Sequence, residues 1–277
     1  MKPIRTKQIN DFRIKKVRLP QLSQKKIRGS EILPIYSNVF ICAKKNSGKS
    51  TCIFNMLKKC VDRDTILDFF VSTIEKDRTW KAIVEYFTNK GCIVNPHMST
   101  IGENGEDLIG DIIDTPVEWT DDEESSSSEE EDLKYISIDD PNKRDQEPKE
   151  KKRKKKKKAQ KRVIVLDDLS TELKKPSIDR LLKINRHLGS KVILSSQYLN
   201  DLSPQSRRQV DVWMLFPGLK QNKLSQVLRD CDSRLEYPEF EEVYRYCTSK
   251  KYNFMTLYCD DDSYRKNLNE KIIIEEE

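Results

Sequence analysis

The feature that most constrains the fold of this chain is the segment VFICAKKNSGKS at residues 39–50. Residues 39–42 form an apolar run with no internal polar residue, which is typical of a parallel strand buried on both faces. Residues 51–60, TCIFNMLKKC, carry apolar side chains at helical spacing. The segment therefore predicts a strand, a loop and a helix, with the loop at a helix N-terminus, where anions bind well.

The loop, AKKNSGKS, resembles the phosphate-binding pattern G-x-x-x-x-G-K-[ST], with Ala43 in place of the first glycine. In that pattern Gly48 lets backbone N–H groups converge on phosphates, Lys49 neutralises the β- and γ-phosphate oxygens, and the Ser50 hydroxyl holds Mg²⁺. Alanine can replace the first glycine if its φ stays negative. The predicted ATP contacts are Ala43, Lys44, Lys45, Asn46, Ser47, Gly48, Lys49, Ser50 and Thr51. The alternative is a buried strand that runs into a polar turn and an amphipathic helix.

Charge is unevenly distributed along the 277 residues, which are 36% hydrophobic and 35% charged with a formal net charge of +6. We expect a basic arm at residues 1–33, an ATPase domain at 34–268 and a tail at 269–277. An acidic, serine-rich block and a lysine run fall within residues 118–161. Such blocks cannot bury apolar area, so we expect a disordered insertion there, with the lysines either contacting nucleic acid or pairing with the acidic block.

The cysteine pattern and the lengths of the apolar runs indicate the cellular compartment of the protein. Seven cysteines are scattered without a C-x-x-C pair, and the histidines are His97 and His187, so neither a zinc site nor a disulfide framework is expected. No stretch approaches the roughly 18 apolar residues that span a bilayer, and the N-terminus lacks the apolar centre of a signal peptide. We expect an intracellular protein, in cytoplasm or nucleus, without a membrane partner.

Strand and helix patterns alternate along the rest of the chain. Residues 65–73 and 91–96 read as strands, and residues 77–87 between them have helical spacing. This alternation predicts an α/β fold with a mainly parallel sheet flanked by helices.

Paired aspartates follow the next apolar strand, RVIVLDD, at residues 162–168. Because ligands of open parallel sheets bind at the carboxyl ends of strands, we expect Asp167 to hold Mg²⁺ together with Ser50, and Asp168 to orient or deprotonate the attacking water. The alternative is that one aspartate caps the following helix.

Further candidates surround two later strands. Gln197 ends KVILSSQ, where a polar side chain can sense the γ-phosphate or position the water. Arg207 and Arg208 precede the strand VDVWMLF, and Arg186 precedes the Gln197 strand. Each arginine could serve its own site or act as a finger for a neighbour's γ-phosphate, although many arginines make only surface contacts.

The order AKKNSGKS, VIVLDD, NRHLG, VILSSQ, RRQVDVWMLF and KYNFMTLYCDDDSYRKN, over residues 34–268, resembles the poxvirus-type DNA-packaging ATPases. These ATPases occur in large DNA viruses, virophages and Maverick/Polinton elements, within the FtsK/HerA superfamily. The resemblance implies a RecA-like P-loop NTPase core in which the Gln197 strand lies between the strands that carry the phosphate loop and Asp167. Many relatives have glutamate where this chain has Asp168.

The resemblance also implies an activity. We expect an ATPase, acting as a homo-oligomeric ring, that translocates double-stranded DNA into capsids and so contacts capsid or portal components. The alternatives are a nucleic-acid- or capsid-binding protein with a degenerate loop that does not hydrolyse ATP, or another ATPase such as a DNA-dependent helicase or a small-molecule kinase. Ala43 favours the non-hydrolysing alternative, whereas the absence of an evident helicase motif series and of a lid-like arginine cluster disfavours the other two.

Overall fold

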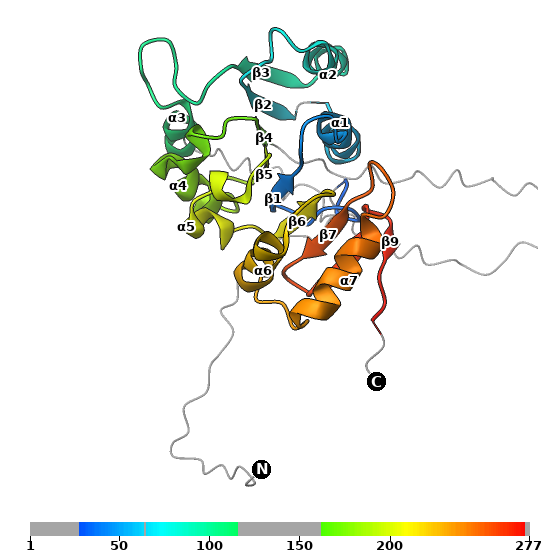
Figure 1. Ribbon diagram of the computed structural model, residues 1–277. Helices are drawn as coiled ribbons and strands as arrows, with labels where there is room; N and C mark the ends of the chain where they lie inside the picture. Colours follow the sequence, from blue (N-terminus) through cyan, green and yellow to red (C-terminus); the bar gives the residue numbers. More distant parts are fainter. Residues whose placement is uncertain (1–27, 64, 116–161, 275–277) are drawn as a thin grey trace, which may run out of the picture. The chain divides into compact units, whose positions relative to one another are not determined.

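The computed structural model describes residues 28–63, 65–115 and 162–274. Its centre is a nine-stranded sheet in the order β3-β2-β4-β5-β1-β6-β7-β8-β9 (Figure 1). The strands are β1 Asn38–Cys42, β2 Ile66–Val71, β3 Ile93–His97, β4 Arg162–Asp167, β5 Ser190–Ser196, β6 Val212–Leu215, β7 Met255–Tyr258, β8 Ser263–Lys266 and β9 Glu270–Lys271. Strands β1 to β6 are parallel and β7 to β9 are antiparallel, so the predicted mainly parallel α/β sheet is confirmed.

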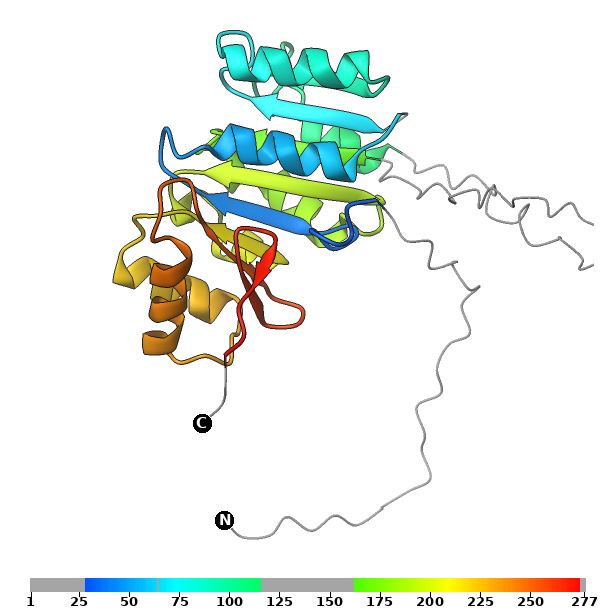
Figure 2. The same ribbon diagram turned by 90° about the vertical axis from the view of Figure 1, so that its right-hand side faces the viewer.

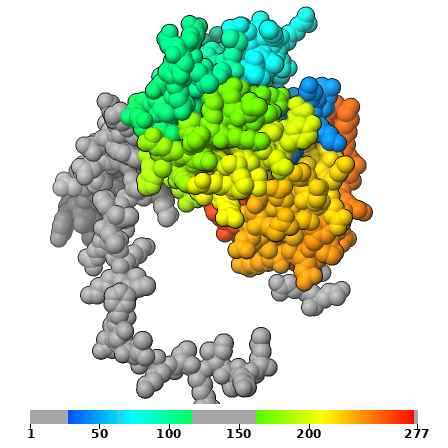
Figure 3. Space-filling view, turned by 60° about the vertical axis from the view of Figure 1, so that its left-hand side comes forward, coloured from blue at the N-terminus to red at the C-terminus, as the bar shows by residue number. Residues whose placement is uncertain are grey.

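Helices cover both faces of the sheet. They are α1 Lys49–Cys60, α2 Arg78–Asn89, α3 Leu108–Asp114, α4 Pro176–Ile184, α5 Pro204–Arg207, α6 Gln221–Asp230 and α7 Tyr237–Cys247, with 3-10 turns η1 Glu172–Lys174 and η2 Leu199–Asp201. Helices α1 and α2 pack on one face, as the blue and cyan helices in Figure 2 show. The other face is covered by α3, α4, α6 and α7, and the green, yellow and orange segments form much of the surface there (Figure 3).

Alternation along β1 explains the two-layered core. Val39 and Ile41 point into the core under α1 and α2, whereas Phe40 and Cys42 point into the core on the opposite face. All four side chains are almost fully buried, which requires apolar residues on both faces of the strand. This is the physical reason that residues 39–42 read as an unbroken apolar run.

The register of the parallel strands aligns their ends. Strand β5 lies between β1 and β4, as the resemblance implied, with Cys42 opposite Ser196 and Asp167 opposite Ser195. The carboxyl ends of β1, β4, β5 and β6 therefore share one edge, which we call the carboxyl edge of the sheet. Their amino ends share the opposite edge, the amino edge.

Residues 28–33 pack against the folded domain. Leu33 is buried, the Tyr258 hydroxyl donates to the carbonyl of Ile32 at 2.6 Å, and Arg265 donates to the carbonyl of Glu31 at 3.2 Å. Most of the predicted arm (1–27), the predicted insertion (118–161) and the last residues of the predicted tail (275–277) lie outside the described residues. No described helix combines the length and the apolarity needed to span a membrane.

Candidate nucleotide-binding site

The phosphate-loop segment leaves β1 without strain at Ala43. The Ala43 N–H donates to the carbonyl of Ser196 at 3.0 Å, which extends the β1–β5 ladder by one residue. Ala43 is buried and is absent from the residues with positive φ, so its methyl group fits where the usual pattern has glycine. Left-handed backbone occurs instead at Asn46, with φ 59°, and at Gly48, with φ 88°.

Gly48 caps the N-terminus of α1, and Lys49 is the first residue of that helix. A Cβ atom at Gly48 would lie 3.3 Å from a ring carbon of Tyr252, so both the backbone conformation and the neighbouring ring favour glycine. The Ser47 hydroxyl donates to the carbonyl of Lys44 at 2.6 Å and closes the loop on itself. Lys44, Lys45, Asn46 and Thr51 are exposed, whereas Ser47, Gly48 and Ser50 are partly buried.

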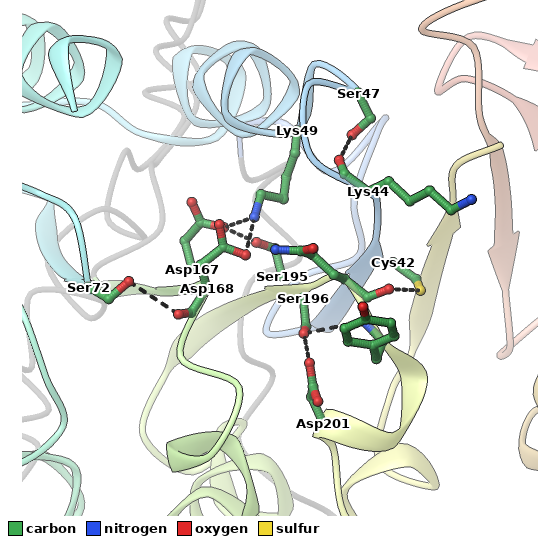
Figure 4. A network of polar contacts seen from close by, with 12 residues as sticks. Cys42, Lys44, Ser47, Lys49, Ser72, Asp167, Asp168, Ser195, Ser196 and Asp201 are labelled. Carbon is green, nitrogen blue, oxygen red and sulfur yellow. Dashed lines mark hydrogen bonds and ion pairs between the residues drawn. The ribbon is translucent and has the colours of Figure 1, made fainter. Parts of the chain in front are cut away.

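The Lys49 side chain points across the carboxyl edge to the paired aspartates of β4. Its Nζ lies 2.8 Å from Oδ1 of Asp167 and 2.6 Å from Oδ1 of Asp168 (Figure 4). The Lys49 and Asp167 side chains are 10% and 3% exposed, and Asp168 is 38% exposed. A cation and two carboxylates, predicted from separate motifs more than a hundred residues apart, therefore form one cluster.

Asp167 is held from three sides. Its Oδ2 accepts a hydrogen bond from the indole Nε1 of Trp80 on α2 at 2.9 Å, and its Oδ1 accepts from the Ser195 hydroxyl on β5 as well as from Lys49. Buried carboxylates are tolerated when such charged and hydrogen-bonding partners surround them. Neither Trp80 nor Ser195 stands in a sequence pattern that indicates a contact with Asp167.

Asp168 has a left-handed backbone, with φ 54°. Its N–H donates to the carbonyl of Ser195 at 3.3 Å, and its own carbonyl accepts from the hydroxyl of Ser72 at 3.2 Å. The next α-helix begins at Pro176 with Lys175 as N-cap, so the structure gives no support to an aspartate acting as a helix cap. The turn after Asp167 instead directs the Asp168 carboxylate back toward Lys49 (Figure 4).

Gln197 follows β5 directly, between the loop on β1 and the aspartates on β4. Its backbone carbonyl accepts from the Cys42 thiol at 3.8 Å. Burial raises the pKa of Cys42 to about 12, so this thiol is a neutral donor. The neighbouring Ser196 hydroxyl donates to Asp201 on η2, which anchors the chain after Gln197 (Figure 4).

Arg186 lies at the opposite end of β1 from this cluster. Arg186 is exposed and pairs at 3.1 Å with Asp211, whose Oδ2 accepts from the N–H of Asn38 at the amino end of β1. The length of β1, about 13 Å at 3.3 Å per residue, separates that position from the phosphate loop. Burial raises the pKa of Asp211, whereas the hydrogen bond from the Asn38 N–H and the charge of Arg186 act to lower it.

Arg207 and Arg208 differ from each other. Arg207 is buried, with Nε 2.7 Å from Oδ2 of Asp230 and Nη1 donating to the carbonyl of Leu202 at 2.9 Å. Arg208 is exposed and precedes β6 at the amino edge. The role of the three arginines, in the site of their own chain or in that of a neighbour, stays a prediction.

The loop between β1 and α1, the strand order and the aspartates after β4 are those of a P-loop NTPase fold, and this predicted fold class is confirmed. The solved structure of B204, the DNA-packaging ATPase from Sulfolobus turreted icosahedral virus, matches 87% of this chain and 99% of its own, with 18% identity and a TM-score of 0.50. The genome packaging NTPase B204 from Sulfolobus turreted icosahedral virus 2, in complex with AMPPCP, matches 86% of this chain and 98% of its own, with 19% identity and a TM-score of 0.49. The resemblance of the sequence motifs to viral DNA-packaging ATPases thus agrees with the similarity in fold. No family model matches the chain, and no curated protein matches it.

Proposed function

We propose that this chain binds and hydrolyses ATP at the carboxyl edge of the sheet. The observation that carries the proposal is the meeting of Lys49, from the phosphate-loop segment, with Asp167 and Asp168 after β4. Residues 43–51 would cradle the triphosphate, and the Lys49 ammonium would neutralise its β- and γ-phosphate oxygens. A shift of that ammonium to phosphate leaves the Asp168 carboxylate free to orient and deprotonate the attacking water.

The residues at the site fit Mg²⁺. Magnesium prefers oxygen donors, and in nucleotide sites it takes one or two carboxylates together with substrate phosphates and waters. Asp167 offers a carboxylate next to the first turn of α1, and Ser50 offers a hydroxyl in that turn. Among the described residues no group of three or more His, Cys, Asp or Glu side chains could hold a metal alone, which agrees with a metal that arrives with the nucleotide. When bound, it would neutralise charge that develops on the phosphates.

Two further roles belong to the proposal. Gln197, which follows the strand between the loop and the aspartates, would sense the γ-phosphate or position the water. Arg186 or Arg208, both exposed at the amino edge, would complete the site of a neighbouring subunit. Arg207 is the weaker candidate because its guanidinium is committed to Asp230.

We further propose that hydrolysis drives double-stranded DNA into a capsid, inside a host cell or in association with the virion. The support is a fold shared with a viral DNA-packaging ATPase, combined with an order of motifs along this chain that resembles the poxvirus-type DNA-packaging ATPases. Ring assembly and capsid or portal partners form part of this proposal. Contacts of lysine and arginine with DNA phosphates predict binding that weakens as salt rises.

The test is ATP hydrolysis by the purified full chain, with and without double-stranded DNA, across a salt series. We expect hydrolysis that DNA stimulates at low salt, and loss of hydrolysis in Lys49→Ala and Asp167→Asn. Lys59→Ala, an exposed lysine at the far end of α1, is the control and should behave as the unmodified chain. Hydrolysis retained in both site variants would overturn the assignment. Hydrolysis that is indifferent to DNA would remove the packaging role and leave an ATPase.

The unstrained backbone of Ala43 weakens the case for a non-hydrolysing protein, because this substitution was the feature that favoured it. A wild-type chain that binds DNA but no nucleotide would restore that alternative.

A further inference from the structure

A cavity of about 230 Å³ lies beside the phosphate-loop segment, on the side away from the paired aspartates. Ser47 of the loop forms one wall, Pro217 after β6 forms another, and residues 248–252 between α7 and β7 form the rest. The strand order β4-β5-β1-β6-β7 places the aspartates on one side of the loop and this cavity on the other. A nucleotide whose triphosphate lies on the loop, with its γ-phosphate toward β4, would direct its base toward β7.

Tyr252 supplies an aromatic wall in an uncommon backbone conformation. Its φ is 69°, which is costly for a bulky side chain, and the residue is 55% exposed. The ring lies against Gly48, with a ring carbon 3.3 Å from where a Cβ atom would stand. The fold holds this residue in place through a turn in which the N–H of Asn253 donates to the carbonyl of Lys250 at 3.1 Å. The exposed aromatic ring therefore lies next to the phosphate loop, on a backbone of uncommon conformation.

Polar groups around the cavity match the edge of a purine. The hydroxyls of Thr248 and Ser249 donate to the carbonyls of Tyr244 and Tyr246 at 2.7 and 3.0 Å, so their oxygens keep lone pairs for an exocyclic amino group. Lys250 and Lys251 line the same cavity, and an ammonium group can donate the hydrogen bonds that ring nitrogens accept. No carboxylate is among the lining residues.

We propose that this cavity binds the purine base of the nucleoside triphosphate, with the base stacked on Tyr252. The inference rests on the proposed function, because it assumes that residues 43–51 hold the triphosphate. The volume lies below the roughly 300–1,000 Å³ of pockets that enclose drug-sized ligands, and so suits one ring system rather than a whole nucleotide. Lys251, whose Nζ lies 4.9 Å from the centroid of the Tyr252 ring, would yield that face to the base.

The experiment compares ATP with inorganic tripolyphosphate, which lacks the base and ribose. Binding of each to the full chain is measured by calorimetry with magnesium present. Tyr252→Asn removes the ring but keeps a residue type that tolerates positive φ, whereas Tyr252→Phe keeps the ring. Tyr246→Asn is the matched control, since Tyr246 is 58% exposed and has the Lys266 ammonium 5.1 Å from its ring centroid, but lies on α7 outside the cavity.

Stacking of a base on an aromatic side chain sets the expected effect. Tyr252→Asn should weaken ATP binding by about 5- to 150-fold and leave tripolyphosphate binding unchanged. Tyr252→Phe and Tyr246→Asn should bind both probes as the wild type does. Equal weakening of ATP and tripolyphosphate in Tyr252→Asn would overturn the proposal, because Tyr252 would then act through Gly48 and the loop. Unchanged ATP binding would also overturn it. A wild-type chain that binds neither ATP nor tripolyphosphate would overturn the proposed function itself.

A second measurement uses the wild-type chain and does not depend on a variant that folds. Photolysis with 8-azidoadenosine triphosphate should label a peptide that contains residues 248–252, and excess ATP should suppress the labelling. Labelling confined to another part of the chain would contradict the assignment of the base.

Discussion

The indole of Trp80 on α2 donates to Oδ2 of Asp167 on β4 at 2.9 Å, a hydrogen bond between residues 87 positions apart in the sequence. We expect Trp80→Phe to lower the free energy of unfolding by about 1.5–3 kcal/mol, because a buried charged oxygen loses its donor. Trp213→Phe is the matched control, since within the described part of the chain the buried Nε1 of Trp213 has no hydrogen-bond partner. Urea unfolding of the two variants measures the difference. Equal losses would show that only ring volume matters at Trp80.

Ala43 provides a test of the altered loop pattern. Ala43→Gly restores the usual glycine, but we expect no gain in ATP affinity because the alanine already has a negative φ. Its stability should fall by about 0.5–1 kcal/mol, the cost of added backbone freedom in the unfolded chain. Calorimetric ATP titration and urea unfolding measure the two effects. A marked gain in affinity would mean that Ala43 restrains the loop.

At position 168, unlike position 43, we expect glycine to give a more stable protein than alanine. Because its φ is 54°, Asp168→Gly should be more stable than Asp168→Ala by about 1 kcal/mol. Both variants lack the carboxylate and should lose ATP hydrolysis if that group acts on water. Backbone strain should show only as the difference in their free energies of unfolding. An alanine variant as stable as the glycine variant would contradict the strained backbone, and a hydrolysing Asp168→Gly would remove the catalytic role.

The arginines should separate into structural and functional residues. Arg207→Ala should cost about 3–5 kcal/mol of stability, because it leaves Asp230 partly buried without its cation. Arg208→Ala changes an exposed side chain and should stay within about 0.5 kcal/mol. If Arg208 serves a neighbour, mixing Arg208→Ala with Lys49→Ala chains should restore part of the hydrolysis that each lacks alone. Full activity of Arg208→Ala would transfer the role to Arg186.

Lys191 should make stability depend on alkaline pH. Burial lowers the pKa of this lysine from 10.5 to about 8, while its Nζ donates to the carbonyl of Pro34 and to the Ser37 hydroxyl at 3.2 Å. Between these two pKa values the unfolded chain binds more protons than the folded chain, so the free energy of unfolding rises with pH. Relative to Lys191→Met, the wild type should gain up to about 3 kcal/mol across that window. Parallel pH profiles of the two proteins would contradict the shift.

Local patterns predicted the elements of the site better than its contacts. The apolar run before Ala43 and the aspartates after β4 follow from burial and from strand-end chemistry, and both lie where these rules place them. The position of β5 between β1 and β4 came from a family resemblance, because local periodicity does not encode strand order.

The contacts that local patterns missed join distant segments. Trp80 read only as a core residue of a helix, although its indole nitrogen reaches Asp167. Tyr252 belongs to the segment KYNFMTLYCDDDSYRKN that carries the family resemblance, but nothing near it in sequence indicates that it packs on Gly48. Arg207 and Arg208 are adjacent in sequence, yet only the fold shows that Asp230 binds one of them.

The separation of the two sheet edges has a consequence for symmetry. Lys49 and the aspartates lie at the carboxyl edge, and Arg186 and Arg208 lie at the amino edge. An arginine that completes a neighbour's site must then join two different surfaces, which is a head-to-tail contact rather than a self-complementary one. A two-fold dimer cannot make that contact through a single shared patch. Copies joined this way either close into a cycle or continue as a filament, so the rotation between neighbours decides whether the assembly is finite.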